Sequence, residues 1–224
     1  MSYRKVSFGL GEIYHVFNRS VARQPIFLSK LDFSRAVDVL NFYSYLKPGL
    51  RYSHYKRLPL EKKSDFLFQL KEKNEKQVEI LAFCLMPNHT HFLVREIQEG
   101  GISTFMSNFQ NSYAKYFNIK HQRVGALFQY MFKAVRVESD EQLLHICRYI
   151  HLNPVTSFVI KDLTKLEAYL WSSYPQYIGK QVDQIVKPEI ILNQFSSVES
   201  FKQFILDQVN YQRELDKIKH LMYE

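Results

Sequence analysis

The centre of the sequence reads Ile80-Leu-Ala-Phe-Cys-Leu-Met-Pro-Asn-His-Thr-His-Phe-Leu-Val94, two apolar runs separated by Pro87-Asn88. Pro and Asn together mark a turn, and the apolar runs on either side have the length of buried strands. The pattern therefore predicts a β-hairpin with arms at 78–86 and 89–95. Because alternate side chains of a strand face the same way, His89 and His91 share one face and Thr90 the other.

Two neutral imidazoles side by side on a strand are a pair of potential metal ligands. A His-x-His match is short, and such matches also arise by chance or as two half-buried histidines near a turn. Whether His89 and His91 bind a metal therefore depends on what the rest of the chain places beside them.

The segments around the hairpin predict alternating strands and helices. Alternation with β-branched and aromatic residues indicates strands at 12–18 and 129–137. Apolar residues at helical spacing indicate helices beginning after Ser29, over 102–117 and after Ser139. The last of these should end near Asn153, because Pro154 disfavours helical geometry at the residue before it. Helices over one face of a mostly antiparallel sheet, in this order, give an α+β sandwich of the ferredoxin-like kind.

The division of the chain follows from the same pattern. We expect a main domain over 1–178, with a charged insertion at about 51–77 that holds one short amphipathic helix. A C-terminal helical extension over 179–224 is expected to contain a charged helix around 198–221.

Composition narrows the function and the compartment. The formal net charge of +8 favours a polyanionic partner, most often nucleic acid, although many basic proteins bind no specific anion. Cys84 and Cys147 lie inside apolar runs, as expected for reduced core thiols of a cytoplasmic protein. The N-terminus lacks an apolar signal core, and the longest apolar run is too short to span a membrane.

A second constellation follows the predicted sheet, at Arg148-Tyr-Ile-His-Leu-Asn-Pro-Val155. Tyr149 and Asn153 are four residues apart and so share one face of a helix. With this motif the sequence resembles the HUH single-strand DNA transposases that have one catalytic tyrosine, in particular their REP-associated branch. The resemblance covers about residues 10–178 and rests on six segments: Tyr14–Arg19, Met86–Phe92, Tyr113–Asn118, Gly125–Gln129 with Phe132-Lys133, Arg148–Val155 and Trp171–Tyr174.

The resemblance implies an HUH endonuclease fold and a role for each matching residue. His89 and His91 correspond to the metal-binding histidines, Asn153 to the third metal ligand, and Tyr149 to the nucleophile. The implied cofactor is Mg²⁺ or Mn²⁺, and the implied chemistry cleaves and rejoins DNA through a 5′-phosphotyrosine intermediate. Thr90 departs from the pattern, since the family has a bulky apolar residue between the histidines.

The implied partner is single-stranded or hairpin DNA, bound by a monomer or a homodimer that has no membrane association. Basic residues are the candidates for contacting its backbone, although each is also a plausible solvated surface charge: Lys115, Lys120, Arg123, Lys133, Arg136 and Arg148.

Several alternatives remain open from the sequence. Tyr113 and Tyr116 are rival nucleophiles, although their apolar neighbours favour packing. The chain could also be a catalytically silent nucleic-acid-binding module of the same fold, or a metal hydrolase that uses water. A degenerate copy of a transposase is the third alternative, and the presence of both histidines, Tyr149 and Asn153 argues against it.

Overall fold

The computed structural model describes residues 7–181 and 185–209. The helices and strands are, in chain order, β1 (Ile13–Arg19), η1 (Val21–Arg23), α1 (Lys30–Ser44), α2 (Tyr52–Tyr55), α3 (Leu60–Lys73), β2 (Val78–Met86), β3 (His89–Glu96), α4 (Gly101–Lys120), β4 (Lys133–Arg136), α5 (Asp140–Thr156), η2 (Leu163–Ala168), α6 (Tyr174–Tyr177), α7 (Glu189–Leu192) and α8 (Val198–Leu206).

The strands form an antiparallel sheet in the order β2-β3-β1-β4. This order, with α1 between β1 and β2 and α4 between β3 and β4, is that of the ferredoxin-like sandwich. The predicted fold class is therefore confirmed. The predicted hairpin is also present, with β2 and β3 joined at Pro87-Asn88.

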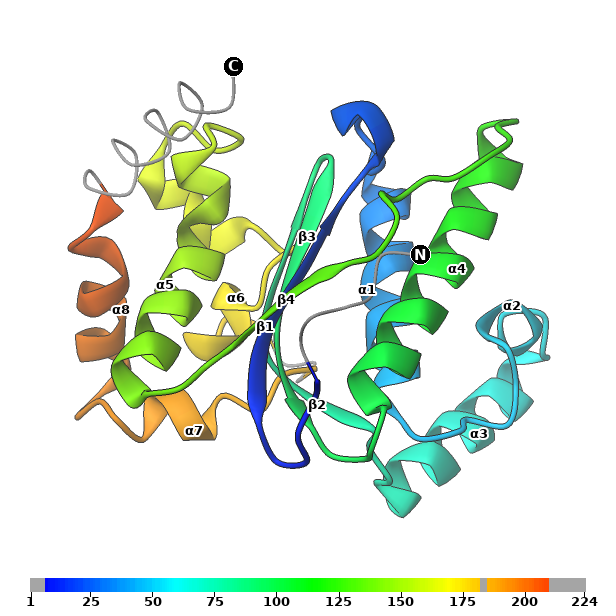
Figure 1. Ribbon diagram of the computed structural model, residues 1–224, viewed down its shortest axis with the longest axis horizontal. Helices are drawn as coiled ribbons and strands as arrows, with labels where there is room; N and C mark the ends of the chain where they lie inside the picture. The colour runs from blue at the N-terminus through cyan, green and yellow to red at the C-terminus, as the bar shows by residue number, and fades with distance from the viewer. Residues whose placement is uncertain (1–6, 182–184, 210–224) are drawn as a thin grey trace.

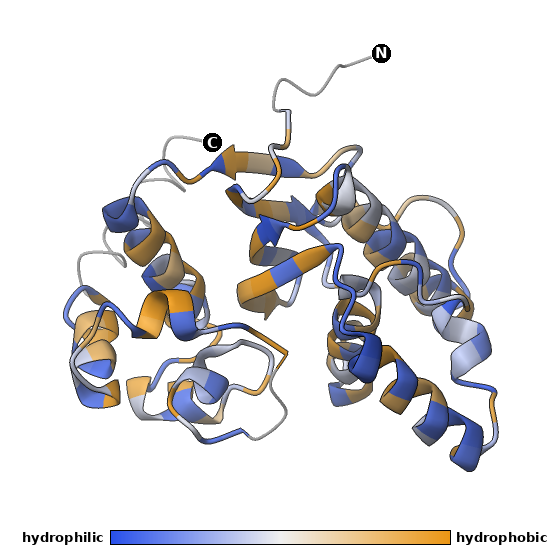
Figure 2. Ribbon diagram, turned by 90° about the horizontal axis from the view of Figure 1, so that it is seen from below, coloured by the Kyte–Doolittle hydropathy of each residue, from blue (hydrophilic) through white to orange (hydrophobic). Residues whose placement is uncertain are grey.

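The helices cover both faces of the sheet, and not one face as the sequence predicted. Helices α1 and α4 lie on one side of the sheet, and α5 lies on the other (Figure 1). The physical reason is β2, whose residues are buried almost without alternation, so both of its faces need a cover. Figure 2 shows hydrophobic residues gathered on the strands and on the helix surfaces turned toward them.

Helix α5 is longer than the sequence predicted. It continues through Pro154 to Thr156 instead of ending near Asn153. Val155 is fully buried and Thr156 nearly so, and the amide of Ser157 still donates to the carbonyl of Asn153 at 3.0 Å. Packing of this last turn therefore outweighs the local preference of the residue before a proline.

Two further elements differ from the prediction. Strand β4 spans only Lys133–Arg136 of the predicted 129–137, because Met131 has a positive φ of 62° that is incompatible with a regular strand. The charged interval over 51–77 contains two helices, α2 and α3, where one was predicted.

The outer edge of β2 is covered by the segment that follows α5. The amide of Leu85 donates to the carbonyl of Trp171 at 2.8 Å, and the amide of Ser173 donates to the carbonyl of Phe83 at 2.9 Å. The amide of Lys187 reaches the carbonyl of Ile80 farther along the same edge, at 2.8 Å. The motif Trp171–Tyr174 therefore covers part of the outer edge of β2.

The C-terminal part of the described chain packs on α5. The Arg148 guanidinium donates to the carbonyl of Phe204 in α8 at 3.1 Å and lies 4.2 Å from the centre of its ring. The helix predicted around 198–221 corresponds to α8, and the positions beyond 209 lie outside the described residues. A boundary at residue 178 stays a prediction.

Two predictions about side chains and membranes can be compared directly with the described residues. Cys84 and Cys147 are buried and free, as predicted for core thiols. Over 7–181 and 185–209, none of the helices has the length and apolar character needed to cross a membrane.

Replacing Thr90 with Val should stabilise the protein. Thr90 is fully buried on the face of β3 opposite the histidines, and its hydroxyl finds no hydrogen-bond partner among the described residues. Val keeps the shape and removes the unsatisfied group, so the free energy of unfolding should rise by about 1 kcal/mol. Urea denaturation measures this change. The exposed Thr104→Val is the control, and a less stable Thr90→Val protein would mean that the hydroxyl is hydrogen-bonded.

Candidate functional site

An open cleft lies over the face of β1, β3 and β4 that α5 leaves partly uncovered. Its volume is about 690 Å³, and its lining includes His15, Arg19, His89, His91 and Tyr149. The strand register builds the floor of this cleft in rows. Arg19 lies opposite His89, and Phe17 lies between His91 on one side and Lys133 on the other. His15 starts the next row, between Leu93 and Val135.

The structure brings the four main residues predicted for the site together. The rings of His89 and His91 have their centres 5.0 Å apart. The ring of Tyr149 on α5 meets His91 edge to face, with the ring centres 5.4 Å apart. Asn153, one helical turn beyond Tyr149, hydrogen-bonds to His89 through its side chain. The spacing along β3 and α5 therefore produces one cluster.

His89 is uncharged in this environment. Burial, which is the largest cause, and the charge of Arg19 lower the pKa of His89 to about 4, and the hydrogen bond with Asn153 acts in the opposite direction. A neutral imidazole offers a lone pair to a metal ion. The Nδ1 atom of His89 lies 2.7 Å from Oδ1 of Asn88, which leaves Nε2 as the nitrogen turned toward the cleft cluster.

A third histidine joins this cluster, and the sequence analysis did not identify it. His15 Nε2 lies 2.9 Å from Nδ1 of His91, and burial lowers the pKa of His15 to about 4. The alternation of 12–18 implies that His15 and Phe17 share one face of a strand, and Arg19 follows in the same phase. The pairing of that strand with β3 was the missing information.

The donor atoms at this site suit a divalent metal ion. Over 7–181 and 185–209, no group of three His, Cys, Asp or Glu side chains is arranged to hold a metal. The available set is two imidazoles, His89 and His91, with the amide of Asn153 beside them. Imidazole nitrogens bind divalent transition metals, and an amide oxygen is the kind of ligand that Mn²⁺ and Mg²⁺ also accept.

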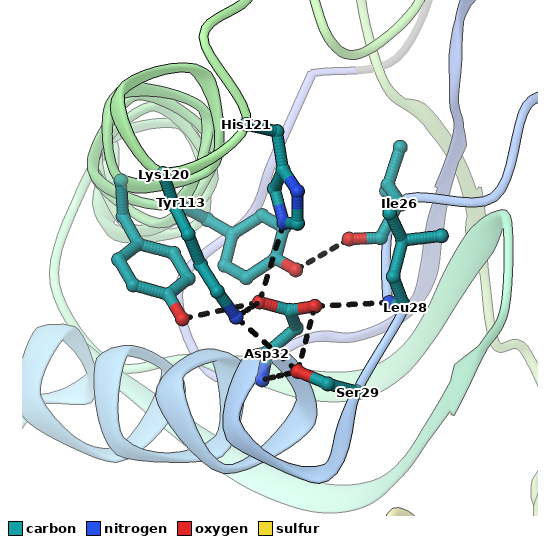
Figure 3. Close-up of polar contacts among 8 residues, drawn as sticks. Ile26, Leu28, Ser29, Asp32, Tyr113, Lys120 and His121 are labelled. Carbon is teal, nitrogen blue, oxygen red and sulfur yellow. Dashed lines mark hydrogen bonds and ion pairs between the residues drawn. The ribbon is translucent and has the colours of Figure 1, made fainter.

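Tyr113 and Tyr116 lie on α4, across the sheet from the histidines. The Tyr113 hydroxyl donates to the carbonyl of Ile26 at 2.5 Å, and the Tyr116 hydroxyl donates to Asp32 at 3.1 Å. Figure 3 shows the polar cluster around Asp32 with Tyr113 beside it, and Tyr116 joins this cluster through its hydrogen bond to Asp32. Burial raises the pKa of both hydroxyls. These two tyrosines therefore hold α4 to the start of α1.

Only one of the six basic residues predicted to contact DNA lines the cleft, namely Lys133. Three others, Lys115, Lys120 and Arg123, lie on or just after α4 on the opposite side of the sheet. Of these, Lys120 is paired with Asp32 at 2.6 Å. Arg136 pairs with Glu12 at 2.8 Å, and Arg148 is buried beneath α8.

Two cleft cations were missed by the sequence analysis, Arg19 and Arg23. Arg19 continues the alternation of His15 and Phe17 along β1. Arg23 follows the strand at a positive φ of 56°, a turn conformation that the sequence did not indicate. With Lys133 they give the cleft a positive lining beside the histidines.

A central strand with His-x-His on one face, beneath a helix that carries one tyrosine, is the arrangement that the resemblance to the HUH transposases implies. Residues 56–153 match the family described as "Transposase IS200 like", and the matched region contains His89, His91, Tyr149 and Asn153. In this region the chain is therefore similar to the IS200-like transposases, and the resemblance inferred from the motifs is confirmed.

The fold has a match among solved structures. The one described as "Structure of the REP associates tyrosine transposase bound to a REP hairpin" is 15% identical in sequence and has a TM-score of 0.51. The similarity covers 84% of this chain and 91% of that chain, so it shows the fold over most of both. No protein of curated function matches the sequence.

Proposed function

We propose that the protein is a metal-dependent transposase that cleaves and rejoins single-stranded DNA through a covalent bond to Tyr149. The observation that carries the proposal is the position of Tyr149 over the His89–His91 pair, in a cleft lined by cations. The similarity of residues 56–153, which include His89, His91 and Tyr149, to the IS200-like transposases supports the same function.

The reaction can be written as the bonds that form and break when Tyr149 attacks DNA. The Tyr149 oxygen attacks the phosphorus of a phosphodiester, forming a tyrosine–phosphate bond and breaking the bond to O3′. The products are a 5′-phosphotyrosine and a free 3′-hydroxyl, and the proton lost by the tyrosine balances the proton gained by O3′. Because the phosphodiester energy is kept in the covalent bond, the strand can be rejoined without ATP.

His89, His91 and Asn153 would hold the divalent ion, Mg²⁺ or Mn²⁺. When bound, the ion would neutralise charge on the scissile phosphate and align that phosphate for in-line attack. Neutral ligands suit this task, because an uncharged donor set leaves the positive charge of the ion available to the phosphate.

The substrate is proposed to be unpaired DNA beside a hairpin. Arg19, Arg23 and Lys133 line the cleft and can neutralise successive phosphates. Tyr130, which is 84% exposed and lies in the chain between the lining residues Gln129 and Met131, offers a face on which an unpaired base can stack. The structural relative is described as bound to a REP hairpin, which supports testing hairpins first.

Incubation of the protein with labelled hairpin oligonucleotides and Mn²⁺ tests this function on denaturing gels. We expect a protein–DNA species that survives boiling in detergent, together with a shorter strand ending in a 3′-hydroxyl. Binding without any cleavage would favour the silent DNA-binding module, and cleavage without an adduct would favour a hydrolase that uses water.

His91→Ala should lose cleavage while keeping most of the affinity for the hairpin. The substitution removes a proposed metal ligand, whereas phosphate contacts elsewhere in the cleft supply the affinity. Gel shifts in EDTA measure binding apart from cleavage. Unfolding of the His91→Ala protein, seen by circular dichroism, would instead identify His91 as a structural histidine.

A further inference from the structure

We propose that His15 is a positioning residue: it accepts a hydrogen bond from Nδ1 of His91 and so presents Nε2 of His91 to the metal ion. The inference rests on the proposed function only in taking His91 as a metal ligand. Its geometric basis is the 2.9 Å distance between His15 Nε2 and His91 Nδ1.

The strand register makes this contact possible. On β1, His15 lies opposite Leu93, and His91 is therefore its diagonal neighbour, two residues along β3. Diagonal neighbours on one face of a sheet are within reach of long or aromatic side chains. The two imidazole rings have their centres 5.2 Å apart and their planes 21° apart, so the ring edges can share a hydrogen bond.

Of the two β1 side chains whose rings lie beside His91, His15 supplies a polar contact. Phe17 lies beside His91 with ring centres 5.7 Å apart and planes 26° apart, and it has no hydrogen-bonding group. The hydrogen bonds of a neutral imidazole decide which of its two ring nitrogens carries the proton. An acceptor at Nδ1 of His91 places the proton there and leaves the lone pair on Nε2.

His89 has a matching arrangement, which supports the direction of the hydrogen bond. Nδ1 of His89 faces Oδ1 of Asn88 at 2.7 Å, and the Asn88 amide nitrogen donates to the carbonyl of Arg23 at 2.9 Å. That second contact turns the amide oxygen of Asn88 toward His89, so His89 must donate from Nδ1. Both histidines would then carry the Nδ1 proton and present Nε2.

An imidazole acceptor has a chemical consequence that a carboxylate would not share. Histidines that bind metals usually donate their other ring proton to a carboxylate, a carbonyl or water. His15 can perform this task without a negative charge, because an imidazole accepts a hydrogen bond through an unprotonated ring nitrogen and is then uncharged. The cleft beside Arg19, Arg23 and Lys133 thus remains favourable for anionic DNA.

The test compares His15→Phe with His15→Gln in the full-length protein without DNA. Phe keeps the ring but has no acceptor, whereas the Gln side chain offers an amide oxygen. Binding of Mn²⁺, followed by electron paramagnetic resonance, should weaken 10- to 100-fold in His15→Phe, which is the usual range for losing such a partner. His15→Gln should recover most of that loss, and His54→Phe, at an exposed residue of α2, should bind Mn²⁺ like the unchanged protein.

Nitrogen NMR of the metal-free protein reports the tautomer of His91 directly. We expect the Nδ1–H form in the unchanged protein and a shift toward Nε2–H in His15→Phe. Equal Mn²⁺ affinity of His15→Phe and the unchanged protein, or an Nε2–H form of His91 in the unchanged protein, would overturn the proposal. Circular dichroism confirms that each variant is folded.

Failure of the proposed function would look different. In that case His91→Ala would bind Mn²⁺ as tightly as the unchanged protein, or no variant would bind it. The tautomer of His91 in the metal-free protein would still decide whether His15 accepts the hydrogen bond.

Discussion

Tyr149→Phe is expected to eliminate the covalent protein–DNA species completely. The substitution removes one oxygen, and the half-buried ring keeps its contacts with His91 and His15. Without that oxygen no phosphotyrosine can form, and cleavage should fall by a factor on the order of 10³ or more, as when other enzymes lose their nucleophile. Detergent gels with labelled hairpin DNA measure the adduct.

The two tyrosines of α4 provide the matched controls for this experiment. Tyr113→Phe and Tyr116→Phe each remove one hydroxyl from the opposite side of the sheet, so both proteins should still form the adduct. Each loses a hydrogen bond, buried for Tyr113 and part-buried for Tyr116, and should be less stable by about 1 kcal/mol. An adduct that persists in Tyr149→Phe and disappears in one of the controls would move the nucleophile to that residue.

Asp32→Asn is expected to have the largest effect on stability. The Asp32 carboxylate is fully buried and accepts from the amide of Leu28 at 3.0 Å, from Lys120 at 2.6 Å and from Tyr116. Figure 3 shows how these groups converge on it from α1, α4 and the segment before α1. An amide cannot serve all of these donors, and Lys120 would lose its counter-charge. We expect a loss of about 3 kcal/mol in the free energy of unfolding.

The same cluster makes stability depend on pH in acid. Burial raises the pKa of Asp32, but the hydrogen bonds from Lys120, Ser29, Tyr116 and Leu28 outweigh it, and the net shift is downward. The native protein therefore binds fewer protons than the unfolded chain in acid. The contribution of Asp32 is complete above the pKa of an unfolded aspartate, about 3.9, and is lost as the pH falls through the lowered value.

Urea denaturation at pH 7 and at pH 3 measures both effects. The difference between the unchanged protein and Asp32→Asn should shrink at the lower pH. Asp65→Asn on α3 is the control, because Asp65 is exposed and should change stability by less than about 0.5 kcal/mol. Equal stability of Asp32→Asn and the unchanged protein at pH 7 would mean that Asp32 contributes nothing net.

The parts of the site that lie within one element were predictable from the sequence. Alternation along β3 placed His89 and His91 together, and helical spacing placed Tyr149 and Asn153 together. Local signals also gave the start of α1, where the Ser29 side chain accepts from the amide of Asp32. These relations depend only on the geometry of a strand, a helix or a cap.

The parts that depend on pairing between elements were not predictable. The contact between His15 and His91 requires the register of β1 against β3, which the sequence of either strand leaves open. The burial of Arg148 requires α8 to pack on α5, and the basic character of its side chain gave the opposite expectation. Pro154 inside α5 shows the same limit, because a local preference yielded to packing.

The sheet offers other chains little opportunity to extend it. A bare edge strand can pair with a neighbouring molecule and begin aggregation. The edge at β2 is occupied by the backbone around Trp171 and Ser173, and the edge at β4 is only four residues long and ends in the charges of Lys133 and Arg136. The sheet that forms the floor of the cleft is thereby protected against edge-to-edge association with other molecules.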